Sequence, residues 1–247
     1  VHKPTVATIM MGMNDVGRGL YGKENPDAAN LKRRQDALKR HADSMTKLTA
    51  ALVKAGAKPI FILPSIYDET STMAKTNLFG VNGALGICAK GATQLAEANQ
   101  AGVVDFWGEM NRLNAQVQKA DPKATIVGGD RVHPGSFGHF LMAYTFLEAQ
   151  NVPPIVSRMG LDATGGKAVR QDNCAISAVK QTDTGLRFTC LAKSLPYPIQ
   201  RGTEPALKLV PFIEKMNQEI LRVQGLAAGN YALLIDGQEV GVYEAKA

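Results

Sequence analysis

Two short stretches of the chain hold side chains that are suited to chemistry. The first, "GGDRVHPG" at residues 128–135, places Asp130 and His133 three positions apart between glycines and a proline. A histidine can take a proton from a nucleophile, and a carboxylate beside it can hold its tautomer and stabilise the imidazolium. A three-residue spacing in a loop or a first helical turn brings two such side chains together. The simpler alternative is that Asp130 caps a helix starting at Pro134 and that His133 is an ordinary loop residue.

The second stretch is "GMND", residues 12–15. Gly12 lets the backbone approach a ligand closely, and the amide of Asn14 is a neutral donor that can face a developing oxyanion. Glycine, asparagine and aspartate are also common turn residues, so a plain turn is the alternative. We expect Gly12, Met13 and Ser65 to line the substrate pocket of this site, since each lies at or directly after the carboxyl end of a predicted strand.

The elements that must position these residues alternate between strands and helices. Apolar runs predict buried strands at 5–12, 58–65 and 101–108. A long amphipathic helix is predicted between the first two, with Asn25 as N-cap, Pro26 at its first position and Gly56 as its end. Further helices are predicted over 81–99 and 109–121, and directly after His133. This order is typical of a parallel sheet with helices on both faces and a site at the carboxyl ends of its strands.

The pattern changes near residue 150, which predicts an α/β core over 1–150 and a β-rich region over 151–247. Short strand-like segments follow one another there, and Asp236-Gly237 indicates a hairpin turn. One helix is predicted over 204–226, broken near Pro211. No internal repeat interrupts either region.

Composition narrows the classes of function. The formal net charge is +6, aromatic residues make up 6%, and much of the basic excess lies within residues 32–40. We interpret that stretch as a solvated helix face that also carries His41, and we expect no nucleic-acid partner because no recognition motif accompanies it. No apolar run is long enough for a membrane span. The cysteines, Cys88, Cys174 and Cys190, lack metal-site spacing, and a Cys174–Cys190 disulfide and free thiols both remain open.

Together, the two stretches resemble the SGNH hydrolases, also called the GDSL esterase family, over residues 5–150. A strand that ends in GxND is followed about a hundred residues later by DxxHP before the last helix of an α/β core. The resemblance implies a three-layer α/β/α fold with a parallel, flavodoxin-like sheet. It assigns the oxyanion donor to Asn14, the orienting carboxylate to Asp130 and the general base to His133. It further implies small acyl or acetylated carbohydrate esters as substrates, no cofactor and no metal.

The chain departs from the family pattern in one respect. The family's serine block and its oxyanion glycine block both precede GxND, but only thirteen residues precede Asn14 and neither block is present. Ser136 lacks the setting of a nucleophile, and Ser65 is expected only in the pocket. We therefore expect an upstream segment, such as a companion N-terminal peptide, to carry the serine, and by analogy a secreted or periplasmic protein. The alternative function is an inactive SGNH-fold binding or interaction module.

Overall fold

The computed structural model describes residues 3–246, which divide into two compact units. The first unit comprises residues up to 152 together with 200–210, and the second comprises 153–199 together with the residues from 211 onward. The elements of the first unit are β1 (Val6–Ile9), η1 (Arg18–Leu20), α1 (Ala28–Lys54), β2 (Lys58–Ile62), α2 (Val81–Ala98), β3 (Gly102–Val104), α3 (Phe106–Ala120), α4 (Ser136–Ala149) and η2 (Glu204–Lys208). Those of the second are β4 (Ile155–Asp162), β5 (Lys167–Asp172), β6 (Cys174–Thr182), β7 (Gly185–Ala192), α5 (Phe212–Met216), β8 (Gln218–Gln224), β9 (Gly229–Ile235) and β10 (Gln238–Ala245).

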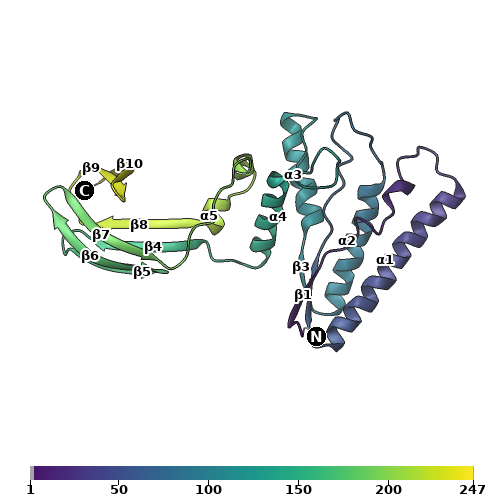
Figure 1. Ribbon diagram of the computed structural model, residues 1–247, viewed down its shortest axis with the longest axis horizontal. Helices are drawn as coiled ribbons and strands as arrows, with labels where there is room; N and C mark the ends of the chain where they lie inside the picture. Colours follow the sequence, from purple (N-terminus) through teal and green to yellow (C-terminus); the bar gives the residue numbers. More distant parts are fainter. Residues whose placement is uncertain (1–2, 247) are drawn as a thin grey trace. The chain divides into compact units, whose positions relative to one another are not determined.

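The first unit is built on a parallel sheet with the strand order β1-β2-β3. Helices α1 and α2 pack on one another and on β2, whereas α4 contacts β3. Figure 1 shows α1 and α2 on one side of the strands and α4 on the other. The predicted three-layer α/β/α fold with a parallel sheet is thereby confirmed. Its strands all end at one edge, which is where the predicted site residues should gather.

Apolar packing fixes the sheet against α1 and α2. Ile9 of β1 and Phe61 of β2 are buried in one cluster with Met45 of α1 and the small side chains of α2, Ala89, Ala92 and Ala96. Alanines on the facing side of a helix let its backbone lie close to a sheet. The cluster extends to Leu63, just past the end of β2, so it fixes α1 and α2 against the sheet along the whole of this strand.

The long helix α1 starts two residues later than its sequence predicts. Its N-cap is Asp27, whose carboxylate accepts a hydrogen bond from the backbone N–H of Asn30 at 2.6 Å, so the prediction of Asn25 as cap and Pro26 as first residue was wrong. A carboxylate at this position satisfies an otherwise unpaired N–H of the first turn, which favours Asp27 over the earlier start. Gly56, with φ of 81°, directly follows Ala55, the C-cap of α1, and so marks the end of the helix as predicted.

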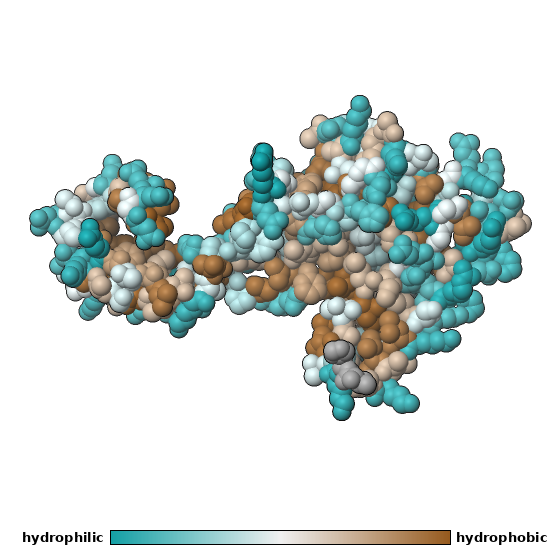
Figure 2. Space-filling view, viewed as in Figure 1, coloured by the Kyte–Doolittle hydropathy of each residue, from teal (hydrophilic) through white to brown (hydrophobic). Residues whose placement is uncertain are grey.

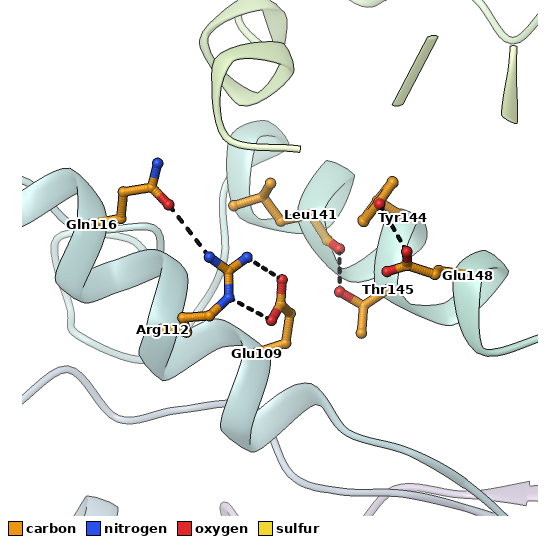
Figure 3. A network of polar contacts seen from close by, with 7 residues as sticks. All are labelled: Glu109, Arg112, Gln116, Leu141, Tyr144, Thr145 and Glu148. Atoms are coloured by element: carbon orange, nitrogen blue, oxygen red, sulfur yellow. Dashed lines mark hydrogen bonds and ion pairs between the residues drawn. The ribbon is translucent and has the colours of Figure 1, made fainter. Parts of the chain in front are cut away.

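Helices α3 and α4 pack side by side, and polar side chains line this contact (Figure 3). Arg112 of α3 donates to both carboxylate oxygens of Glu109, and Tyr144 of α4 donates to Glu148 at 3.1 Å. Burial first, and then the hydrogen bond and the charge of Glu148, raise the pKa of Tyr144 to about 12. The phenol of Tyr144 is therefore neutral throughout the physiological range of pH.

Strand β1 is at the edge of the sheet in the described part of the chain. It pairs with β2 along one side, and no strand within residues 3–246 pairs with the other. Val6 of β1 is 50% exposed, and Met10 and Met11, which follow the strand, are 43% and 51% exposed. Apolar side chains reach the surface at this end of the unit in Figure 2. An apolar edge strand with free backbone groups is a template for pairing with a further strand.

The second unit consists mainly of short sheets. Strand β4 pairs antiparallel with β5 and parallel with β8, while β6 with β7 and β9 with β10 form two antiparallel hairpins. The β9–β10 turn is at Asp236 and Gly237, both with positive φ, which confirms the predicted hairpin. The cysteines are all free thiols, with Cys88 and Cys174 buried and Cys190 exposed.

The helix predicted over residues 204–226 was wrong over most of its length. Only the short helices η2 and α5 form, and residues 218–224 are strand β8. The segment "QEILRVQ" has apolar residues at both helical and alternating spacing, so the sequence leaves the choice open. Pairing with β4, for example Ile220 beside Arg158, decides it in favour of a strand. Among the described helices of both units, none has the length and hydropathy to cross a membrane.

Candidate active site

The loop that contains Asp130 and His133 is held by its own backbone. The N–H of Gly128 donates to the carbonyl oxygen of His133 at 2.7 Å, and the N–H of Arg131 donates to the carbonyl oxygen of Gly128 at 2.8 Å. A Cβ atom on Gly128 would lie 2.6 Å from the carbonyl oxygen of His133, so only glycine allows this close approach. We call residues 128–135 the histidine loop.

The structure brings Asp130 and His133 into direct contact. One carboxylate oxygen of Asp130, Oδ1, accepts from the backbone N–H groups of Val132 and His133 at 3.0 and 2.9 Å. The other, Oδ2, lies 2.5 Å from Nδ1 of the His133 ring. Asp130 thus makes both contacts together, capping the loop through Oδ1 and pairing with the histidine through Oδ2. The helix that follows begins at Ser136 and takes Gly135 as its N-cap, so Asp130 does not cap α4.

The charge on Asp130 is strongly favoured. The hydrogen bond with the His133 ring first, and then the backbone N–H groups of His133 and Val132, hold the pKa of this carboxyl well below its usual range. The His133 side chain is 77% exposed, and within residues 3–246 its Nε2 atom has no hydrogen-bond partner. A histidine whose Nδ1 is bound to a carboxylate and whose Nε2 faces solvent can accept a proton from a hydroxyl group that approaches Nε2.

Asn14 lies in a tight turn at the end of β1. The carbonyl oxygen of Gly12 accepts from the N–H groups of Asp15 and Val16 at 2.9 and 3.0 Å, which closes one helical turn. Gly12 has φ of 136°, a conformation that other residues rarely adopt. The Asn14 side chain is exposed and has no hydrogen-bond partner in the described part of the chain. Its amide is therefore free to donate to a ligand.

A shared apolar cluster places the turn and the histidine loop at the same edge of the fold. Val16, just after Asn14, and Val132, just before His133, are buried in one cluster, and the half-buried Met13 packs against it. A Cβ atom on Gly12 would lie 3.3 Å from Cβ of Pro64, so the segments that follow β1 and β2 lie close together. The half-buried Ser65 comes directly after Pro64. All the predicted site residues thus belong to the carboxyl edge of the sheet, although Met13 lies partly in the core.

The described serines make no hydrogen bond with the His133 ring. Ser136 is the first residue of α4, and no serine oxygen within residues 3–246 is hydrogen-bonded to the His133 ring. Over the same residues, histidine, cysteine and carboxylate side chains form no group of three or more that could hold a metal ion.

The structure adds two polar residues to this region that the sequence did not point to. His41 of α1, expected on a solvated face, is only 8% exposed, and its Nδ1 lies 2.9 Å from Oδ2 of Asp15, so that expectation was wrong. Arg131, inside the histidine loop, is 2% exposed and bonded to a ring of backbone carbonyl oxygens. Both contacts join segments far apart in the chain, and no local pattern predicts contacts of that kind.

Comparisons with known proteins identify the family of the α/β unit. Residues 1–146 match the family model of GDSL-like lipases/acylhydrolases. A gut microbial diltiazem-metabolizing enzyme, BT4096, is 32% identical with a TM-score of 0.82; the match covers 98% of this chain but only 56% of the enzyme, so the chain spans about half of its length. No curated protein matches.

Two further solved structures are more distant. Axe2, an acetylxylan esterase from Geobacillus stearothermophilus, is 23% identical with a TM-score of 0.44, over 60% of this chain and 59% of that one. LAE5, an alpha/beta hydrolase enzyme from the metagenome of Lake Arreo, Spain, is 22% identical with a TM-score of 0.43, over 60% of each chain. With more than half of its residues matched by the family model and both polar stretches at one sheet edge, the chain belongs to the GDSL-like lipase/acylhydrolase family.

Proposed function

We propose that the protein is a serine ester hydrolase that acts on small acyl or acetylated carbohydrate esters. The observation that carries the proposal is the Asp130–His133 pair, in which Nδ1 is bound to the carboxylate and Nε2 is open. In the reaction, His133 takes the proton of a serine hydroxyl as the serine attacks the ester carbonyl, and it then returns that proton to the leaving alcohol. Asp130 stabilises the imidazolium, and the Asn14 amide donates to the tetrahedral oxyanion.

The serine belongs, in this proposal, to a companion segment upstream of the chain. The unpaired edge of β1 supports it, because a further parallel strand would satisfy the free backbone groups and cover Val6 and Met10. The length of the diltiazem-metabolizing relative, of which this chain covers 56%, leaves room for such a segment. We call the chain together with this segment the complete protein.

The first substrates to test follow from the family and from that relative. Esters of acetate with p-nitrophenol and with xylose report the two halves of the proposed substrate class. Diltiazem is the third, because the relative at 32% identity is described as metabolizing it. Hydrolysis of p-nitrophenyl acetate alone would limit the proposal to small acyl esters.

The test is a mass measurement and N-terminal sequencing of the native protein, followed by labelling with a fluorophosphonate. We expect an upstream or companion peptide with a labelled serine, and loss of labelling in a His133→Gln variant that still folds. N-terminal sequencing also tests the proposed export, since removal of a leader would leave a processed end. A native protein that lacks such a serine and takes no label would refute the hydrolase and leave the alternative, an inactive binding module.

A further inference from the structure

Arg131 separates Asp130 from Val132 and His133, yet it points the other way. Asp130 and His133 are exposed with side chains 47% and 77% accessible, whereas Arg131 is 2% exposed. The backbone of Arg131 has φ of 69°, in the left-handed region that residues other than glycine seldom occupy. Such a conformation persists only where the surrounding contacts impose it, so the contacts of Arg131 must hold its backbone in place.

The guanidinium of Arg131 is surrounded by backbone carbonyl oxygens of residues 68–75. Its Nη1 donates to the carbonyl oxygens of Asp68 and Ser71 at 2.9 and 3.1 Å. Its Nη2 donates to those of Met73 and Lys75 at 3.1 and 2.9 Å, and its Nε donates to Lys75 again at 3.2 Å. In return, the backbone N–H of Asp68 donates to the carbonyl oxygen of Arg131 at 3.0 Å. We call residues 68–75 the acceptor loop.

The acceptor loop is itself firmly anchored. The buried carboxylate of Asp68 accepts from the N–H groups of Thr70 and Ser71 and from the side chain of Gln118 in α3. Ser71 Oγ donates to the carbonyl oxygen of Lys123 at 2.9 Å. A planar guanidinium with five donors in a fixed fork can be held in one orientation by such a ring, whereas a lysine ammonium cannot reproduce the fork.

We propose that Arg131 is a positioning residue, which sets the orientation of the Asp130–His133 pair by clamping the histidine loop to the acceptor loop. This inference rests on the proposed function for its effect on turnover. Arg131 touches neither substrate nor reacting atoms. It acts through the backbone on either side of it, from which both members of the pair project.

The alternative is that Arg131 only stabilises the acceptor loop. The two interpretations differ in one measurable property, the tautomer of His133. The contact with Asp130 requires the proton of the neutral imidazole to be on Nδ1, and a mere loss of stability does not change this preference in the molecules that remain folded.

The experiment is 15N NMR of the imidazole rings in the 247-residue protein, comparing the natural chain with Arg131→Lys and Ser71→Ala. The chain has four histidines, and a His133→Gln variant assigns the His133 signals. We expect Nδ1-protonated shifts in the natural chain and a move toward the Nε2-protonated tautomer in Arg131→Lys. Ser71→Ala loosens the acceptor loop without touching the guanidinium, and we expect a smaller move in the same direction. This second variant keeps the test available if Arg131→Lys does not fold.

The matched control is Met45→Ala, a core truncation between α1 and the sheet, away from the histidine loop. In the complete protein, Arg131→Lys should lower kcat for p-nitrophenyl acetate by about 10–100-fold with KM within about twofold, because a misplacement of about 1 Å costs that much. Met45→Ala should melt earlier but keep both its kcat and its His133 shifts. Unchanged His133 shifts in folded Arg131→Lys would overturn the positioning role. Moved shifts together with an inactive complete protein would support that role and refute the proposed function instead.

Discussion

The exchange of Asp130 for asparagine separates two roles of this carboxylate, accepting hydrogen bonds from the loop backbone and pairing with the His133 ring. Asparagine retains an oxygen at the Oδ1 position, so the hydrogen bonds from the N–H groups of Val132 and His133 can stay. It replaces Oδ2, 2.5 Å from Nδ1 of His133, by an NH₂ group that can only donate. The imidazole must then carry its proton on Nε2, where it can no longer accept one from a nucleophile. We therefore expect Asp130→Asn to fold normally and to be a poor enzyme.

The size of the effect follows from how exposed the pair is. In a buried serine-protease triad the same exchange lowers kcat by about 10⁴-fold, which corresponds to about 5.5 kcal/mol. Asp130 is 47% accessible and His133 is 77% accessible, so solvent screens their interaction and eases return to the productive tautomer. We expect a smaller loss for Asp130→Asn, of about 10²–10³-fold in kcat or about 3–4 kcal/mol.

The assay is p-nitrophenyl acetate hydrolysis by the complete protein, with urea unfolding of each variant in parallel. Asp105→Asn is the matched control, because Asp105 also accepts a backbone N–H through Oδ1, that of Gly108 at 2.7 Å, and has no histidine beside it. This control should keep both its stability and its kcat. If Asp130→Asn retained more than half of the natural kcat, the orienting role of Asp130 would be wrong, whatever its effect on stability.

Three further predictions can be tested on the 247-residue chain. Gly128→Ala should lower the free energy of unfolding in urea by about 1–3 kcal/mol, because its Cβ atom would meet a backbone carbonyl oxygen at 2.6 Å. The control Gly129→Ala, whose Cβ atom would have no neighbour within 4 Å, should change this free energy little. Equal effects of the two substitutions would contradict the close approach. Burial and nearby carboxylates raise the pKa of Tyr144 to about 12, whereas a tyrosine of the unfolded chain titrates near about 10. The folded state therefore holds this proton more tightly, and the free energy of unfolding should fall as pH rises between these two values. A Tyr144→Phe variant should lose this part of the pH dependence of urea unfolding. Burial first, and then the charge of a nearby aspartate, raises the pKa of the Cys88 thiol to about 11. Ellman's reagent should therefore modify the exposed Cys190 first and Cys88 only after unfolding. Early reaction in a Cys174→Ser/Cys190→Ser variant, in which Cys88 is the one remaining thiol, would contradict this order.

The features that the sequence predicted correctly depend on residues close together in the chain. The contact between Asp130 and His133 follows from a spacing of three residues between glycines and a proline. The alternative, in which Asp130 caps a helix starting at Pro134, was wrong, because α4 begins at Ser136 with Gly135 as its N-cap and Asp130 caps the loop instead. The helix α2 and the Asp236-Gly237 hairpin likewise depend on neighbouring residues, and both form where the sequence predicts them.

Contacts between distant segments escaped prediction. The bond between His41 and Asp15 spans 26 positions, and nothing near His41 distinguishes it from the solvated residues of the same helix. Strand β8 exists because β4 offers it a partner about sixty residues earlier in the chain. The inward direction of Arg131 is a third case, since an arginine between two polar residues of a loop is expected in solvent.

The histidine loop departs from ordinary local preferences at several neighbouring positions, and this concentration is itself informative. Arg131 is a buried charge with a left-handed backbone, and Gly128 passes a carbonyl oxygen at a distance that excludes any side chain. Each departure costs free energy, which the contacts with the acceptor loop offset. Meanwhile Nε2 of His133, like the Asn14 amide within residues 3–246, has no partner. A chain selected for stability alone would have no reason to hold a strained loop so firmly in order to present an unbonded imidazole to solvent. This combination supports the proposal that His133 transfers a proton at this edge of the sheet.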